Sequence, residues 1–197
     1  MNIINNPGRQ LGRPRSTDSR DSILKATNQL LEEVGFSQLT IEGIAARAGV
    51  AKTTIYRWWN NKGSIAIEAF LKSTEPRISF PQSDSAIADI KEQVKTLAAV
   101  YQTQTGKIIT ELIAMGQENA DTLHLFIEGY VKPRRSAAKA VLQRAIDLGE
   151  IRADVDLDVL VDAIYGPIFH RLLLGHERLD PAFAEANANL VLAGAMK

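Results

Sequence analysis

A short stretch near the N-terminus carries side chains suited to contacting nucleic acid. It reads Lys52-Thr53-Thr54-Ile55-Tyr56-Arg57-Trp58-Trp59. Lysine, threonine, tyrosine and arginine are residues that donate hydrogen bonds to phosphates and base edges. In a helix, Ile55 and Trp59 lie four residues apart on one face and can both turn toward a core. The polar side chains, together with Trp58, are then left for solvent or DNA.

The residues before this stretch favour a helix-turn-helix. Thr40 is a good N-cap for a short helix with Glu42 in its first turn, and Gly49 is expected to end that helix. The next helix is expected from about Lys52 to Trp59. Two short helices joined by a tight glycine-containing turn, with a longer helix before them, form a helix-turn-helix whose second helix enters the major groove.

The flanking segments complete this domain. A first helix is expected from a cap at Asp18 to Val34, ending at Gly35, and a fourth helix is expected to start near the capping residue Asn61. Residues 1–18 are polar, contain proline and glycine, and are predicted to form a disordered basic arm. Its Arg13 and Arg15 could enter a minor groove, or the arm could simply be solvated. Both interpretations stay open.

The rest of the chain shows apolar residues at helical spacing and no sustained alternation with a period of two. The predicted fold class is all-α: a helix-turn-helix domain over residues 19–72, a proline- and serine-containing linker over 73–86, and a helical bundle over 87–197. A break in this bundle is expected at Pro133. A few aromatic and sulfur-containing side chains of the apolar stripes are candidate walls of an internal pocket: Tyr101, Met115, Phe126, Tyr130 and Phe169.

Composition limits the other function classes. The chain has no cysteine, its 23 basic and 23 acidic residues balance, and residues 1–62 are the more basic part. We see no signal peptide and no transmembrane stretch, so a cytoplasmic location is expected. No catalytic grouping or phosphate-binding glycine loop is evident, so we expect no enzyme, no catalytic residue and no cofactor.

No metal site is predicted either. The acids Asp154, Asp156 and Asp158 superficially match a calcium loop, but Val159 and Tyr165 stand where its glycine and glutamate belong. These acids are better explained as residues at the N-terminus of a helix. The histidines His170 and His176 are six residues apart, a spacing that does not stack them on one helix face.

The stretch from Asp21 to Leu71 resembles the DNA-binding domain of the TetR family. The residues that carry the resemblance run from Thr40 to Lys62, with Ile-Ala, Ala-Gly-Val and Thr-Ile-Tyr in order, an aromatic residue three after the tyrosine, and a lysine three after that. Three positions depart from the family pattern. Ala51 replaces a common capping serine, Trp58 replaces histidine or arginine, and Gly63 replaces a helix-favouring residue.

The resemblance implies roles by position. By the resemblance, the residues that contact phosphates are Thr40, Thr54, Tyr56 and Lys62. The residues that read bases would be Lys52, Thr53 and Arg57, and Trp58 would lie near the side of the helix that faces DNA. A looser similarity from Arg152 to Gly194 implies a ligand-binding and dimerisation domain, with the last two helices forming the dimer interface.

Small residues in the last helix would let the partner helices approach closely: Ala182, Ala184, Ala186, Ala188 and Ala193. The expected function is a homodimeric transcriptional repressor. It would bind double-stranded operator DNA with a palindromic sequence and be released by a small apolar or amphipathic effector. The alternative is a helical protein-interaction or architectural DNA-binding protein without a ligand switch.

Overall fold

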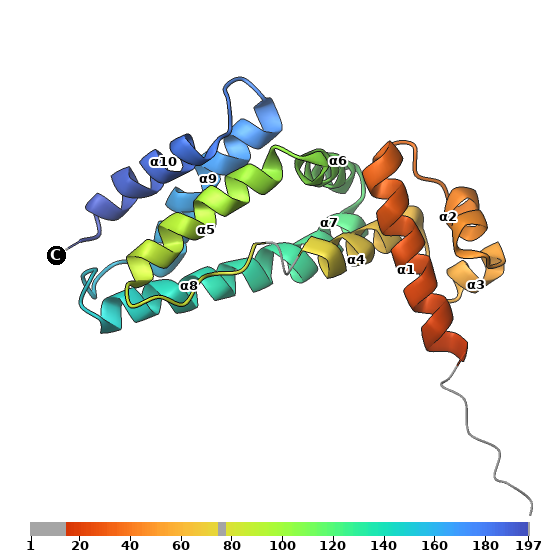
Figure 1. The fold of residues 1–197 in the computed structure, drawn as a ribbon, viewed down its shortest axis with the longest axis horizontal. Helices are drawn as coiled ribbons and strands as arrows, with labels where there is room; N and C mark the ends of the chain where they lie inside the picture. Colours follow the sequence, from red (N-terminus) through yellow and green to blue (C-terminus); the bar gives the residue numbers. More distant parts are fainter. Residues whose placement is uncertain (1–14, 75–77, 197) are drawn as a thin grey trace, which may run out of the picture.

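The computed structural model describes residues 15–74 and 78–196, and these residues form an all-α fold. A single isolated bridge pairs Ile151 with Met196. Figure 1 shows α1 to α4 gathered at one end of the molecule and α5, α8, α9 and α10 at the other. The elements are α1 (Arg15–Val34), α2 (Ile41–Ala48), α3 (Lys52–Tyr56), α4 (Lys62–Thr74), α5 (Ala86–Tyr101), α6 (Gln104–Glu118), α7 (Ala120–Phe126), the π-helical segment η2 (Ile127–Val131), α8 (Lys132–Asp147), α9 (Leu157–Leu174) and α10 (Pro181–Ala193).

Helix α1 starts earlier than expected from the sequence. It begins at Arg15, so Asp18 lies in the first turn, where its charge favours the helix N-terminus, and does not cap the helix. The predicted cap at Asp18 is therefore wrong. The predicted end is right, because Gly35 follows α1 with a φ of +77°, which a glycine adopts without strain. Arg13 and most of the predicted arm lie outside the described residues.

The four N-terminal helices share a core of aliphatic and aromatic side chains. Ile23 and Leu31 of α1 are fully buried, as are Ile44 of α2 and Ile55 of α3. Helix α1 packs against both α2 and α4. The longer helix thus supports the two short ones, which is the arrangement a helix-turn-helix needs.

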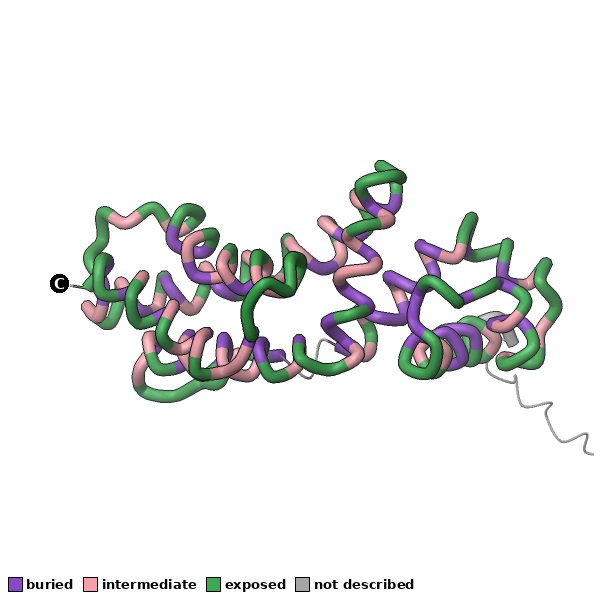
Figure 2. Tube along the Cα trace, turned by 90° about the horizontal axis from the view of Figure 1, so that it is seen from above, coloured by how far each residue is buried: buried purple, intermediate pink, exposed green. Residues whose placement is uncertain are grey.

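The C-terminal helices form a bundle around α5. This helix packs against α8 and α10, and its inward face carries Ile90, Val94 and Leu97. Figure 2 shows buried and exposed residues alternating along the helices, as expected when each helix turns one face inward. Among the described residues, no helix is both long and apolar enough to cross a membrane.

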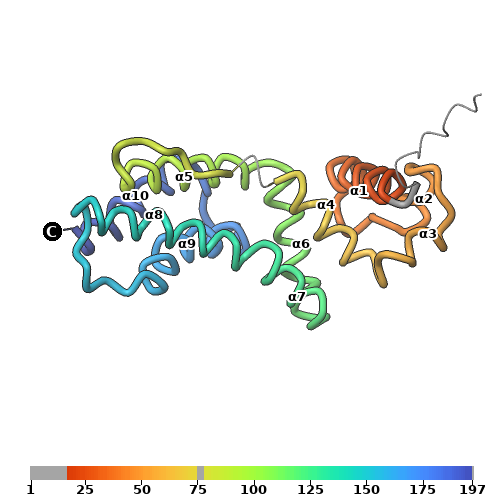
Figure 3. Tube along the Cα trace, turned by 90° about the horizontal axis from the view of Figure 1, so that it is seen from below, coloured from red at the N-terminus to blue at the C-terminus, as the bar shows by residue number. Residues whose placement is uncertain are grey.

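The expected break at Pro133 is absent. Helix α7, η2 and α8 follow one another without a loop, as Figure 3 shows. Proline has no N–H, so within a continuous helix one carbonyl of the preceding turn loses its usual donor. Pro133 lies in the first turn of α8, and the preceding π-helical turn closes with a bond from the Lys132 N–H to the Ile127 carbonyl. The chain therefore passes Pro133 with its helix intact.

Candidate functional site

The polar side chains of α3 lie on the outside of the molecule. Ile55 is fully buried and Trp59 is 4% exposed, so the face predicted to turn inward does so. Lys52, Tyr56 and Arg57 are exposed. The helix proper ends at Tyr56 and not at Trp59 as predicted, because the N–H groups of Trp58 and Trp59 both bond to the Ile55 carbonyl and close the chain into a turn.

The two ends of α2 have the predicted chemistry. The Thr40 hydroxyl oxygen accepts the Gly43 N–H at 3.0 Å, which caps α2 and leaves the hydroxyl proton available to another acceptor. Gly49 ends α2 with a φ of +66°. Ala51 makes no side-chain cap, so α3 lacks the hydrogen bond that a serine would provide.

One of the predicted base-reading residues is held by an ion pair. The Lys52 ammonium lies 2.9 Å from the Glu42 carboxylate, and both side chains are exposed. The hydrogen bond from Lys52 lowers the pKa of Glu42. The pair fixes Lys52 at the start of α3, next to the turn from α2.

Lys62 makes hydrogen bonds within the protein, besides its predicted contact with a phosphate. Its ammonium donates to the carbonyl oxygens of Phe36, Ser37 and Leu39 at 3.1 to 3.4 Å. It also lies 4.6 Å from the centre of the Phe36 ring. Lys62 therefore ties the start of α4 to the loop between α1 and α2, and its contact with DNA stays a prediction.

Trp58 and Trp59 are adjacent but lie in different surroundings. Trp58 is 42% exposed, whereas Trp59 is buried and donates its indole N–H to Glu68 at 2.8 Å. The Arg20 guanidinium lies 5.7 Å from the Trp58 ring and 5.8 Å from the Trp59 ring. Trp58 is thus the accessible tryptophan of the two, and its place beside DNA stays a prediction.

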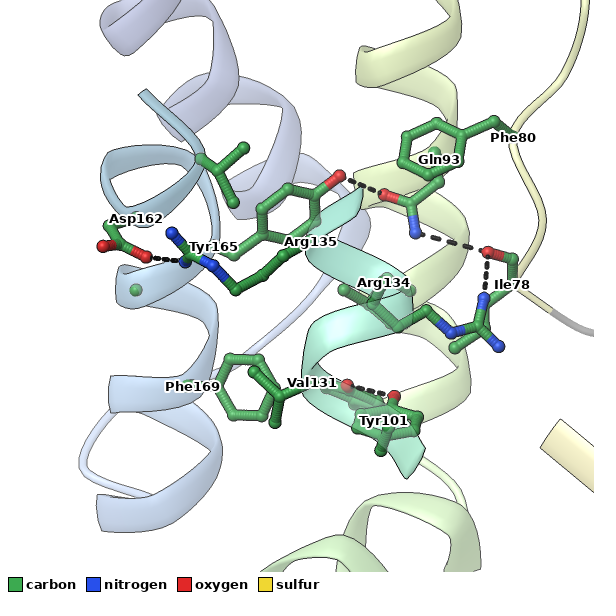
Figure 4. Close-up of a pocket in the computed structure, with 14 residues that line it drawn as sticks. Ile78, Phe80, Gln93, Tyr101, Val131, Arg134, Arg135, Asp162, Tyr165 and Phe169 are labelled. Carbon is green, nitrogen blue, oxygen red and sulfur yellow. Dashed lines mark hydrogen bonds and ion pairs between the residues drawn. The ribbon is translucent and has the colours of Figure 1, made fainter. Parts of the chain in front are cut away.

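A second site is a cavity of about 190 Å³ inside the C-terminal bundle. Figure 4 shows side chains from α5, α8 and α9 converging on it. The walls are mostly apolar and aromatic, with a few polar groups, as in small-molecule sites. The lining residues are Ile78, Phe80, Gln93, Leu97, Tyr101, Tyr130, Val131, Arg134, Arg135, Val161, Asp162, Tyr165, Gly166 and Phe169.

Three of the five predicted wall residues line this cavity. The Tyr101 and Tyr130 hydroxyls lie 2.7 Å apart, and the Phe169 ring packs edge-on against Tyr101. The expectation for Met115 and Phe126 is not met. Phe126 stacks behind Tyr130 in the core. Met115 points toward Gly63, where an added Cβ would lie only 2.8 Å from the Met115 Cε. The glycine that departs from the family pattern therefore leaves room for this methionine.

The remaining polar groups of the cavity were not found from the sequence. Tyr165 donates its hydroxyl proton to the Gln93 side chain at 2.8 Å, and Arg134 donates to the Ile78 carbonyl at 3.1 Å. Burial raises the pKa values of the Tyr101, Tyr130 and Tyr165 hydroxyls, so all three stay protonated near neutral pH. The only sequence signal for Arg134 is its place in an arginine pair on a helix, which also fits an exposed surface.

Comparison with known proteins assigns both parts of the chain to one family. Residues 23–69 match the family model of bacterial regulatory proteins of the tetR family, and residues 80–191 match the tetracyclin repressor-like C-terminal domain. The chain belongs to the TetR family of transcriptional regulators. It is 37% identical over 172 residues to the uncharacterized HTH-type transcriptional regulator YdeS of Bacillus subtilis, covering 87% of each chain.

Three further comparisons agree with this family and fold. The DNA-binding transcriptional repressor TetR of Mycobacteroides abscessus is 30% identical over 165 residues, covering 82% of this chain and 85% of that protein. The solved structure of the TetR family regulator SCO0332 superposes with a TM-score of 0.82 at 38% identity, covering 91% of this chain and 100% of that one. FadR of Bacillus subtilis, solved with stearoyl-CoA, shares the fold, with a TM-score of 0.65 at 21% identity, covering 88% and 98%.

TetR-family proteins bind operator DNA as dimers, and α9 and α10 carry large apolar side chains that are exposed in the monomer. Leu190 of α10 is 78% exposed, and Val159 and Leu174 of α9 are also largely exposed. Ala182, Ala186 and Ala193 of α10 are exposed in the monomer, and their contact with a partner helix stays a prediction. Ala184 and Ala188 are fully buried inside the monomer, so the sequence-based assignment of these two to the interface is wrong.

Contacts between the two ends of this TetR-family protein pass through α4 and α6. The Phe70 ring of α4 lies 5.6 Å from the ring of Tyr130, which lines the cavity. The Glu111 carboxylate of α6 accepts the Phe36 N–H at 2.6 Å, directly after α1. Packed side chains therefore connect the cavity wall and α6 with the helix-turn-helix domain.

Proposed function

We propose that this protein is a ligand-responsive repressor that leaves a palindromic operator when a small apolar or amphipathic molecule fills the cavity. The observation that carries the proposal is Tyr130, which lines the cavity on one side and packs against Phe70 of α4 on the other. Helix α4 is the element that follows the helix-turn-helix directly. A ligand that moves Tyr130 can thereby change how the DNA-binding helices are held.

The DNA contacts follow from exposure and chemistry. Lys52, Thr53 and Arg57 lie on the exposed side of α3, where they can reach base edges. Thr40, Thr54, Tyr56 and Lys62 are proposed to hold phosphates and so to set the position of α3 in the groove. Trp58 lies beside them at the exposed C-terminal end of the turn. Arg13 of the N-terminal arm and Arg15 at the start of α1 are proposed as minor-groove contacts.

Dimerisation gives the operator its symmetry. One helix-turn-helix reads only a few base pairs, and a two-fold dimer reads two half-sites related by the same axis. The exposed apolar residues of α9 and α10 support a four-helix interface in which the same surface of each subunit meets. The effector must then favour one spacing of the two recognition helices. The coupling free energy between effector binding and DNA binding is expected to be roughly 1–3 kcal/mol.

Selection of binding sites from a random duplex pool tests the DNA-binding part of the proposal. We expect a palindromic consensus from the wild-type protein. Lys52→Ala and Arg57→Ala should relax the preference at individual base pairs by roughly 1–3 kcal/mol for each bidentate hydrogen-bonded pair that the substitution removes. A consensus without two-fold symmetry, or variants that keep every preference, would contradict the proposal. An architectural protein without a ligand switch would bind with little sequence preference.

A further inference from the structure

Two adjacent arginines of α8 line the cavity but differ in how their charge is balanced. Arg135 pairs with Asp162 and, at 3.0 Å, with Asp158. Arg134 donates only to the neutral Ile78 carbonyl, and among the described residues no carboxylate lies within ion-pair distance of it. The cavity therefore has one positive charge that the described part of the chain does not neutralise.

The tyrosine hydroxyls add donors to this charge and do not cancel it. Tyr101 and Tyr130 share one hydrogen bond, which uses the proton of one hydroxyl. The proton of the other has no acceptor among the described residues, although both side chains are nearly completely buried. The Arg134 guanidinium lies 5.7 Å from the centre of the Tyr130 ring, and Arg134 lines the same cavity as the three tyrosines, so the cation and the hydroxyls belong to one site.

We propose that the effector of this protein is a small carboxylic acid, bound as its anion. The carboxylate would accept hydrogen bonds from the Arg134 guanidinium and from the spare hydroxyl of the Tyr101–Tyr130 pair. Its hydrocarbon part would pack against the apolar walls formed by Leu97, Val131 and Phe169. This inference rests on the proposed function, because it names the chemistry of the ligand that the cavity takes.

The cavity volume limits the size of the acid. An engineered protein cavity of roughly 150 Å³ admits benzene, and the cavity here measures about 190 Å³. A single aromatic ring or a short alkyl chain with a carboxylate therefore fits without a large rearrangement. Phenylacetate and hexanoate are suitable probes, and phenylacetamide and hexanamide are neutral molecules of nearly the same shape.

Calorimetric titration of the purified protein without DNA tests the charge requirement. The wild-type protein should bind the acids and bind the matching amides roughly tenfold more weakly or worse, since a charged hydrogen bond is the stronger one. Arg134→Gln should remove this preference, and Arg134→Lys should keep most of it. Lys132→Gln is the matched control, because Lys132 is an exposed cation on the same helix that does not line the cavity.

The results separate this inference from the proposed function. Equal binding of acids and amides, an unchanged preference in folded Arg134→Gln, or no binding of either acid would each overturn the carboxylate site. DNA release is then measured separately with the acid that binds. Binding that requires Arg134 but releases no operator would support the site and contradict the proposed repressor switch.

Discussion

Single residues on α3 are expected to contribute to DNA binding in different ways. Tyr56 is 54% exposed and is proposed to donate its hydroxyl to a phosphate. Tyr56→Phe should lower the affinity for operator and for unrelated DNA alike, by about 1.5 kcal/mol. The dependence of affinity on salt should stay the same, because the change removes no charge. Fluorescence anisotropy at several salt concentrations measures both quantities.

Comparing the two DNA sequences decides the role of Tyr56. If Tyr56→Phe weakens the operator complex but leaves unrelated DNA unaffected, Tyr56 reads a base and does not hold a phosphate. Lys52→Ala serves as the contrasting variant, since its loss should change both the sequence preference and the salt dependence.

Trp58 is expected to report on DNA directly. Its ring is 42% exposed beside α3, whereas Trp59 is 4% exposed. Adding operator to the wild-type protein should change the tryptophan emission, because the DNA alters the surroundings of Trp58. The variant Trp58→Phe keeps Trp59 and should show almost no change. An equal change in this variant would assign the signal to Trp59 and contradict the placement of Trp58 at the DNA.

At the scale of elements, the packing of α5 against α8 depends on one buried acid. Asp89 of α5 is 1% exposed, forms an ion pair with Arg144 of α8, and accepts hydrogen bonds from the backbone and hydroxyl of Ser83. Burial alone would raise the pKa of Asp89, but the bonds from Ser83 and Arg144 hold it below its usual value of 3.8. The carboxylate therefore stabilises the fold in its ionised form.

Asp89→Asn should lower the free energy of unfolding near neutral pH by about 2–3 kcal/mol. This is less than for a fully enclosed pair, because Arg144 is 34% exposed. Because the pKa of Asp89 is lower in the folded state than in the unfolded state, its contribution to stability is complete above the pKa of the unfolded state. It is lost as the pH falls through the lower pKa of the folded state. The difference between wild type and variant in urea unfolding should thus shrink in acid.

The matched control for this prediction is Asp84→Asn. Asp84 lies in the same segment before α5 but is exposed, so its replacement should change stability little. A pH-independent difference between wild type and Asp89→Asn would mean that the variant loses packing and not the ionised pair.

At the scale of the whole molecule, the exposed face of α9 and α10 should hold two subunits together. Leu190 is 78% exposed, an unusual position for leucine on a helix with so many small residues. Leu190→Glu places a charge on the proposed interface of each subunit and removes apolar surface from it, so it should convert the dimer to monomers at micromolar concentration. Sedimentation velocity measures the change.

Leu125→Glu is the control for dimerisation. Leu125 lies on α7, outside α9 and α10, and is 42% exposed, so its replacement should leave the dimer intact.

The monomeric variant Leu190→Glu should also lose most of its operator affinity while keeping its helical content, because each subunit reads only one half-site. A wild-type protein that sediments as a monomer would contradict both the dimer and the account of induction.

The sequence by itself determined the elements whose signals are local. Thr40, Gly49 and Asn61 act within three residues of themselves, through a cap, a left-handed turn and a second cap. The carboxylate of Asp156 likewise caps α9, as expected for an acid at a helix N-terminus. The motif from Thr40 to Lys62 was enough to identify the family, because the helix-turn-helix requires these residue types at this spacing.

Only the tertiary structure decided which side chains meet. Helical periodicity indicates that a residue faces inward but not which helix it meets, so Tyr101 and Phe126 are both buried and only Tyr101 lines the cavity. Tyr165 bonds to Gln93, 72 residues away, and no local pattern predicts such a partner. Arg134 and Arg135 are adjacent residues of the same type, so the sequence does not distinguish them. They differ because the fold brings Asp158 and Asp162 to one of them and leaves the charge of the other facing the cavity.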